Sequence, residues 1–153
     1  MRLCLFQPDI PQNVGAAIRL AACLGVTLEV IEPCGFPLSD KSLRRVAMDY
    51  VDQVDLEHHD SWEDFLNHPA RKLGRLVLFT TRSARPYVDF SFQAGDTLLF
   101  GRESAGVPDE VHAAADAALF IPIRGRSLNV TKAAAMALGE ALRQTDGFPS
   151  IAD

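Results

Sequence analysis

The sequence has few cysteines, and no two of them have the spacing of a metal or redox motif. Cys4, Cys23 and Cys34 are widely spaced and odd in number, and none forms a C-x-x-C pair. Disulfide frameworks and zinc sites usually show even numbers or short spacings. We therefore interpret all three as free thiols, with Cys4 and Cys23 as small buried residues among apolar neighbours.

Long hydrophobic runs are also missing. The densest apolar stretch, 117–123, falls far short of the roughly 20 residues that a membrane-spanning helix needs. In the opening segment MRLCLFQPDI, Pro8 and Asp9 interrupt the apolar stretch that a secretory signal would require. The sequence predicts an intracellular protein that does not enter a membrane, and we expect it in the cytoplasm.

An excess of basic charge is the third absence. The net charge is −5, whereas domains that coat nucleic acid by bulk electrostatics are generally basic. Any contact with RNA must therefore be local. Four basic clusters are candidates, although such clusters more often mark a solvated face: Lys41 with Arg44 and Arg45, Arg71 with Lys72 and Arg75, Arg82 with Arg85, and Arg124 with Arg126.

Short apolar runs alternate with helical patterns along the whole chain. A length of 153 residues with 48% hydrophobic content fits one domain, and no linker or repeat divides 1–153. The alternation predicts a single α/β domain with a mainly parallel sheet flanked by helices. Strands are expected at 3–6, 28–31, 76–80, 97–100 and 119–123, with a weaker one at 51–56. Helices are expected at 13–25, with Asn13 as cap and Gly25 as stop, from 39 or 40 to 47, at 60–68, after Pro108, and at 129–144.

The segments that leave the strands carry the chemical information, because ligands of such sheets bind at the carboxyl ends of the strands. These exits read QPDIPQNVG, FTTRSARP, LFGRESAGVP and IPIRGRSLNV. The first lacks the G-x-G-x-x-G of dinucleotide sites. The third has the glycine spacing of a phosphate loop, but Val107 and Pro108 stand where lysine and serine or threonine are needed. Both nucleotide-binding readings are excluded.

Ser127 and the histidines suggest other chemistries that the pattern does not support. Ser127 stands in a near match to a nucleophile elbow, but all four histidines precede it, so the required order is missing. We interpret Ser127 as a hydrogen-bonding loop residue or part of a helix cap. The adjacent His58 and His59 point to opposite faces of a strand and are interpreted as surface residues, not metal ligands.

Three polar residues gain weight from their joint position. Alone, Asn13 fits a helix cap, Arg19 a solvated helix arginine and Glu103 an exposed loop carboxylate. Asn13 and Arg19 follow the first strand, and Glu103 follows a later one. Parallel strands bring such exits to one edge of the sheet, so these residues are candidates for a single site.

Taken together, the motifs closely resemble the SPOUT-class RNA methyltransferases, and among them the compact bacterial enzymes that methylate the tRNA wobble ribose. The match covers nearly the whole chain. It includes Pro11-Gln12-Asn13-Val14-Gly15 with Arg19-Leu20, Ile31-Glu32-Pro33 with Gly35-Phe36, Asp40-Lys41 with Leu43-Arg44-Arg45, Asp49-Tyr50, Phe79-Thr80-Thr81, Phe100-Gly101-Arg102-Glu103 with Gly106-Val107-Pro108, and Ile121-Pro122 with Arg126-Ser127-Leu128-Asn129.

The resemblance implies a C-terminal trefoil knot whose loops bind S-adenosyl-L-methionine. By position, the cofactor-contacting residues of the family correspond to Phe79, Gly101, Ile121 and Ser127. The catalytic arginine corresponds to Arg19, surrounded by Asn13, Glu103 and Asn129. The chain departs from many relatives at Arg102 in place of proline, Val107 in place of leucine and Lys132 in place of asparagine.

The implied activity is 2′-O-methylation of the ribose at tRNA position 34, a cytidine or modified uridine, by a homodimer without a metal. An arginine normally stays protonated, so Arg19 is expected mainly to orient the hydroxyl, with general-base action as the other possibility. Two alternatives remain open. One is a SPOUT enzyme acting on another tRNA or rRNA nucleotide, and the other is a catalytically silent RNA-binding module.

Overall fold

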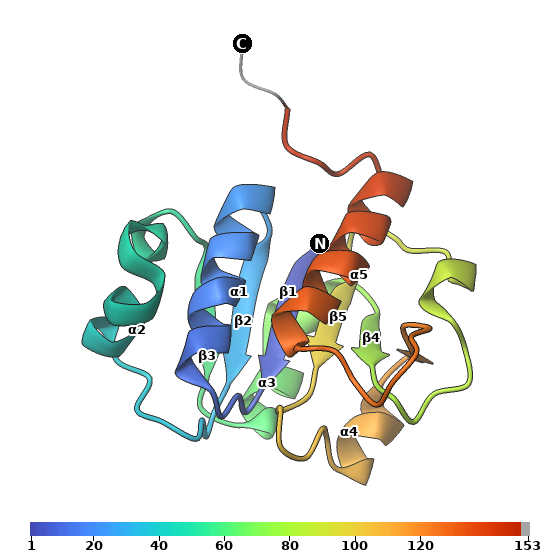
Figure 1. Ribbon diagram of the computed structural model, residues 1–153, viewed down its shortest axis with the longest axis horizontal. Helices are drawn as coiled ribbons and strands as arrows, with labels where there is room; N and C mark the ends of the chain where they lie inside the picture. The colour runs from blue at the N-terminus through green and yellow to red at the C-terminus, as the bar shows by residue number, and fades with distance from the viewer. Residues whose placement is uncertain (151–153) are drawn as a thin grey trace.

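The structure, a computed structural model, describes residues 1–150 as a six-stranded sheet with helices on both faces (Figure 1). The strands lie in the order β3-β2-β1-β5-β4-β6, and all of the described pairs are parallel. The strands are β1 (Arg2–Phe6), β2 (Thr27–Ile31), β3 (Leu56–His59), β4 (Leu76–Phe79), β5 (Thr97–Phe100) and β6 (Ala117–Leu119). The α/β class with a parallel sheet is confirmed. The knot stays a prediction.

Five α-helices and three 3₁₀ helices connect the strands. They are α1 (Pro11–Leu24), α2 (Asp40–Ala47), η1 (Met48–Asp52), α3 (Trp62–Asn67), η2 (Pro69–Leu73), η3 (Tyr87–Asp89), α4 (Asp109–Ala114) and α5 (Val130–Gln144). The predicted positions of all five α-helices are confirmed to within a few residues. No helix within residues 1–150 is long and apolar enough to span a membrane.

Alternate residues of the strands build two cores on opposite faces of the sheet. Leu3 and Leu5 of β1 belong to the larger core, which is covered by α1 and α5. Cys4 and Phe6 belong to the smaller core, which is covered by α3 and α4. This two-residue alternation is the reason that these strands read as continuous apolar runs.

Two of the predicted strands are misplaced. The strand predicted at 119–123 is instead β6, which ends at Leu119. Strand β6 is short because it pairs with the short strand β4, and the apolar residues that follow Leu119 belong to a loop. The weak strand at 51–56 is instead η1 followed by β3. Strand β3 reads LEHH, and Glu57 and His59 belong to a polar cluster while His58 is exposed, so an apolar pattern does not reveal the strand.

The two ends of α1 differ in how well the sequence predicts them. Gly25 ends the helix in the left-handed conformation at φ 65°, as predicted. The predicted start is wrong, because the helix begins at Pro11, whose fixed φ suits the first helical position, and Ile10 precedes it without a side-chain cap. Asn13 therefore lies inside the first turn, where it is buried and free to bond elsewhere.

The predicted burial of two side chains, Cys23 and His59, is also wrong. Cys23 lies on the exposed side of α1, although Cys4 is buried as expected. His58 is exposed, but the pleat of β3 turns His59 inward against α3, where its ring packs on Phe65 at 5.2 Å between centroids. The surface interpretation therefore holds for His58 alone.

Candidate active site

A pocket of about 590 Å³ lies at the carboxyl ends of β4, β5 and β6. Its size falls in the range of small-molecule sites. It is lined by the loops after these strands, by Ile10 and Asn13 near the start of α1, and by the start of α5. Seven of the eight predicted site residues line it: Asn13, Phe79, Gly101, Glu103, Ile121, Ser127 and Asn129.

The floor of the pocket is aromatic and rigid. Phe79, the last residue of β4, stacks on Phe100 of β5 with ring centroids 4.9 Å apart. The Tyr87 ring meets Phe79 edge-on at 6.2 Å. These contacts fix the ends of two neighbouring strands and present a flat apolar surface to a ligand.

A tight turn between Gly101 and Gly106 forms one wall. Arg102 and Gly106 exchange backbone hydrogen bonds of 3.1 and 2.9 Å. A Cβ atom on Gly101 would lie 2.6 Å from the carbonyl carbon of Gly106, so no side chain fits there. The close approach explains the glycine at 101.

A chain of side-chain hydrogen bonds crosses the pocket. The Asn13 amide donates to Glu103 Oε1 at 2.8 Å, and Asn129 Nδ2 donates to Asn13 Oδ1 at 2.9 Å. Asn129 Oδ1 in turn accepts from the backbone N–H groups of Thr131 and Lys132, at 3.0 and 3.3 Å, and so caps α5. Three segments distant in sequence are thereby held as one polar unit.

Asp9 and Ser104 are part of this unit, although the sequence analysis did not single them out. The backbone N–H of Asp9 donates to Glu103 Oε2 at 3.0 Å, and the Ser104 hydroxyl donates to Asp9 Oδ2. Hydrogen bonding with the Glu103 side chain and then with Ser104 lowers the pKa of Asp9 to about 2. Asp9 lies in the segment QPDIPQNVG and Ser104 in the segment LFGRESAGVP, which the sequence already identifies as strand exits. Their position in these segments is the sequence signal that could have pointed to them.

Arg19 lies apart from the pocket. It is on the exposed side of α1, with its guanidinium carbon 5.1 Å from the centroid of the Tyr50 ring. Among the residues that the structure describes, the pocket lining does not include it. A single chain therefore does not bring this arginine to the other candidate residues.

The four basic clusters differ in how they are paired. Arg44, Arg75 and Arg82 make intramolecular ion pairs with Asp52, Asp96 and Asp109 at 2.6, 2.7 and 2.9 Å. Arg124 and Arg126 have no ion-pair partner within residues 1–150, and Arg126 lines the pocket. Arg126 therefore brings a cation without an ion-pair partner among the described residues to the lining of the pocket.

A parallel sheet with a loop-built pocket at the carboxyl ends of its strands, closed by a C-terminal helix, defines a ligand-binding α/β protein. The chain belongs to the SpoU rRNA Methylase family, whose model matches residues 1–139.

Individual relatives agree with this assignment. The chain is 55% identical over 153 residues to the tRNA (cytidine(34)-2′-O)-methyltransferase of Beijerinckia indica, covering 99% of this chain and 96% of the relative. A solved structure concerning the 2-OH methylation of C/U34 on tRNA is 44% identical and has a TM-score of 0.86, with 94% of both chains covered. The SpoU methyltransferase AviRb of Streptomyces viridochromogenes, solved with AdoMet, is 27% identical with a TM-score of 0.82, over 94% of this chain and 60% of that one.

Proposed function

We propose that the protein is an S-adenosylmethionine-dependent methyltransferase that methylates the ribose 2′-hydroxyl of tRNA position 34, a cytidine or modified uridine. The observation that carries the proposal is the hydrogen-bonded unit of Asn13, Glu103 and Asn129 at the edge of the pocket. The 55% identity to an enzyme named for this reaction supports the substrate. The proposal treats residues 1–153 as one knotted domain working in the cytoplasm, where its tRNA is found.

The pocket fits S-adenosylmethionine in size and in chemistry. The Phe79 surface suits a flat ring, and Gly101 and Gly106 line the pocket beside it. Phe79, Gly101, Ile121 and Ser127 would hold the cofactor. When bound, S-adenosylmethionine supplies a methyl group on a sulfonium sulfur, for a displacement that depends on alignment and needs no metal.

The polar unit positions the other reactant. Glu103 is held by two donors, the Asp9 N–H and the Asn13 amide, so its carboxylate has a fixed orientation at the pocket edge. Asn129 ties this orientation to the first turn of α5. Such preorganised groups can align a ribose hydroxyl without reorganising during the reaction.

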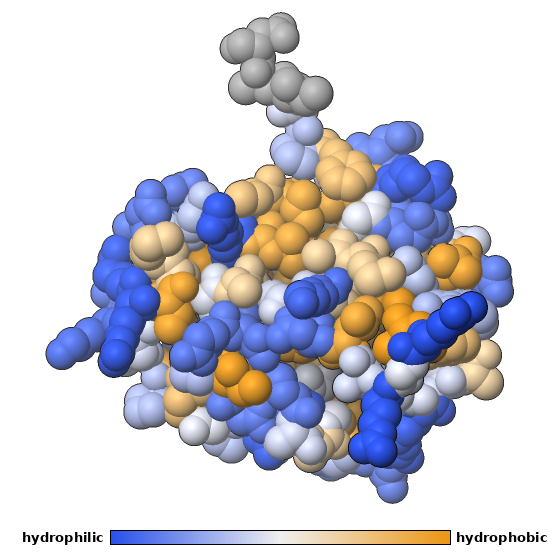
Figure 2. Space-filling view, viewed as in Figure 1, coloured by the Kyte–Doolittle hydropathy of each residue, from blue (hydrophilic) through white to orange (hydrophobic). Residues whose placement is uncertain are grey.

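The proposed site also needs Arg19, and a second copy of the chain can supply it. Arg19 shares the exposed side of α1 with Ala16 and Cys23, at helical spacing. Helices α1 and α5 lie side by side on one face of the sheet, and Figure 2 shows apolar surface over this region. Met136 of α5 is 43% exposed there. We propose a homodimer through α1 and α5 that brings Arg19 of one protomer to its partner's pocket.

Mapping of 2′-O-methylation on tRNA from cells that lack the gene tests the proposed function. The expected result is loss of methylation at position 34, restored by the gene. Loss of methylation at another tRNA or rRNA nucleotide would favour a SPOUT enzyme with a different RNA target. Unchanged RNA would favour the catalytically silent module. Light scattering of the purified protein tests the dimer, and a monomeric mass at the concentration of the activity assay would contradict it.

A further inference from the structure

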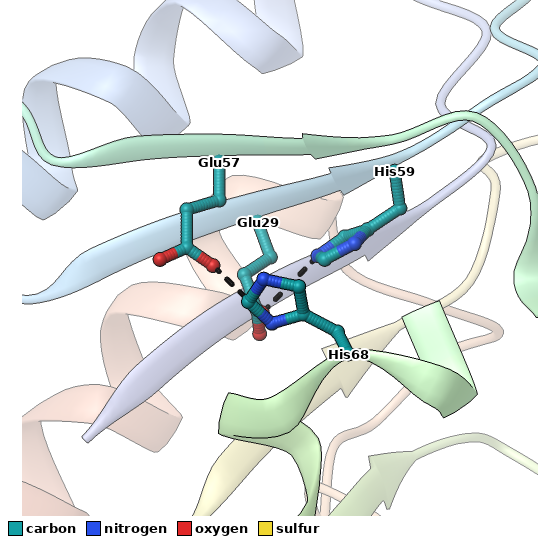
Figure 3. A group of neighbouring side chains, drawn as sticks. All are labelled: Glu29, Glu57, His59 and His68. Atoms are coloured by element: carbon teal, nitrogen blue, oxygen red, sulfur yellow. Dashed lines mark hydrogen bonds and ion pairs between the residues drawn. The ribbon is translucent and has the colours of Figure 1, made fainter. Parts of the chain in front are cut away.

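A second cluster of functional groups lies on the other side of the molecule from the proposed dimer face. Glu29 of β2, Glu57 and His59 of β3, and His68 between α3 and η2 point toward one another (Figure 3). One ligand atom from each residue lies within 4.8 Å of all the others. None of the four lines the pocket described above.

The cluster is deeply placed and incompletely paired. The side chains of Glu29 and His59 are 1% and 2% exposed. Glu29 Oε2 and His68 Nδ1 are buried, and neither has a hydrogen-bond partner within the described residues. A buried carboxylate is costly unless its charge and its lone pairs are matched. Arg2 and His59 contact Glu29 Oε1, so Glu29 Oε2 is the oxygen that is left for a further donor or cation.

From this arrangement we propose that Glu29, Glu57, His59 and His68 form a binding site for a divalent transition-metal ion of the zinc type. Two imidazoles and two carboxylates are donors that zinc accepts in tetrahedral sites. This ion is separate from the methyl-transfer chemistry, for which we expect no metal.

Two of the donor separations are close to those that such a site requires, and all four donor atoms lie within 4.8 Å of one another. Ligands about 2.0–2.2 Å from zinc lie about 3.3–3.6 Å from one another in a tetrahedron. His59 Nε2 is 3.2 Å from Glu29 Oε1, and His68 Nδ1 is 3.9 Å from Glu57 Oε2. Side-chain rotations would be needed to bring all four donors to these separations, and three of the donors are on the neighbouring paired strands β2 and β3.

The guanidinium of Arg2 occupies part of the position that a metal ion would take. Its Nη2 atom lies 3.2 Å from Glu29 Oε1 and also contacts Glu57 Oε2. A metal ion would displace the guanidinium from these carboxylates, since two cations cannot share them closely. The ion has a route of entry, because the side chains of Glu57 and His68 are 31% and 37% exposed. A bound ion would fasten the segment after α3 to the β2–β3 edge.

Titration of the full chain with Zn²⁺ after treatment with a chelator tests the site. Calorimetry is expected to give one ion per chain, and the melting temperature is expected to rise with Zn²⁺. His68→Gln removes a partly exposed ligand and is expected to weaken binding at least about 10-fold, as loss of even an indirect partner of a metal does. Arg2→Met removes the competitor and is expected to strengthen binding.

His58→Gln is the matched control, because it removes a neighbouring histidine that is exposed on the opposite face of β3. It should leave Zn²⁺ affinity unchanged. Co²⁺ serves as a spectroscopic probe: intense visible bands without thiolate charge transfer would identify a tetrahedral nitrogen and oxygen site and exclude the cysteines. The absence of saturable Zn²⁺ binding would overturn the proposal. So would a Zn²⁺ affinity of His68→Gln equal to that of the wild type, or a loss of affinity in His58→Gln as large as that in His68→Gln.

Discussion

The side-chain amide of Asn129 donates a hydrogen bond of 2.9 Å to the amide oxygen of Asn13, across 116 residues of sequence. The Asn13 amide in turn donates a hydrogen bond to Glu103, which is 90 residues away in sequence. The start of α1, the loop after β5 and the start of α5 are thereby locked together. In the proposed reaction this lock aligns the ribose with the methyl donor.

Asn129 has two roles that a pair of substitutions separates. Asn129→Ser retains a good helix cap but leaves the oxygen of the buried Asn13 amide without its donor, so stability should fall by about 1–3 kcal/mol. Methyl transfer should fall up to about 10²-fold, as expected for a misplaced reactant. Asn129→Ala also loses the cap, at about 0.5–2 kcal/mol. Thermal melts and single-turnover assays measure both effects, and full activity of Asn129→Ser would remove the lock from the mechanism.

Arg19 is expected to act across the proposed dimer. Arg19→Ala should lower turnover roughly 10²-fold or more, because a group that positions or stabilises the reacting hydroxyl is lost. S-adenosylmethionine affinity should hardly change, since Arg19 does not line the pocket of its own chain. Arg19→Lys should rescue poorly, because an ammonium lacks the planar fork. Mixed dimers of Arg19→Ala with Asn129→Ser chains should regain part of the activity, because one of their two sites combines an intact Arg19 with an intact Asn129. If Arg19 is only a solvated arginine, Arg19→Ala should show normal turnover.

Arg124 and Arg126 are expected to contact the tRNA backbone. Replacing either by Gln should weaken tRNA binding and reduce the dependence of log Kd on log salt concentration by about 1. Lys72→Gln, an exposed basic residue on η2, is the control. Filter binding at several salt concentrations measures the slopes. An unchanged slope in the double variant would place the RNA elsewhere.

Gly74 and Gly95 face each other just before β4 and β5, but only one of them is sterically required. A Cβ atom on Gly74 would lie 1.8 Å from the Gly95 carbonyl oxygen, whereas one on Gly95 would have its nearest neighbour at 3.4 Å. Gly74→Ala should destabilise the protein by at least about 1–3 kcal/mol. Gly95→Ala should stay within about 0.5 kcal/mol of the wild type. Chemical denaturation distinguishes them, and equal costs would contradict the close approach.

Local sequence signals predict most of the sheet and the helices. The runs at β1, β2, β4 and β5 are apolar because both faces of the sheet are covered, and Gly25 marks a helix end through its own backbone preference. Strand β3 escapes prediction because its residues serve a polar cluster that includes His68 from another segment. β6 is misplaced because its length depends on the strand it pairs with.

The candidate site, like the fold, is predicted by sequence only in part. Asn13 and Glu103 are predicted from the strand exits, because parallel strands end at a common edge. The other five pocket residues are predicted only through the resemblance to the methyltransferase family: Phe79, Gly101, Ile121, Ser127 and Asn129. The cap role predicted for Asn13 is wrong, because its partners Glu103 and Asn129 are distant in sequence and no local pattern names them. The place of Arg19 in a site is still less accessible to local reasoning, since the proposed site needs a second chain.

The most direct measurement of the central claim is methyl transfer by the purified protein to a tRNA transcript, with the modified nucleotide mapped afterwards. The proposed function predicts one methyl group per tRNA, on the ribose 2′-oxygen of nucleotide 34. It also predicts that a tRNA with a 2′-deoxynucleotide at this position accepts none. Methylation of the deoxy substrate, or a methyl group on a base or at another position, would contradict it.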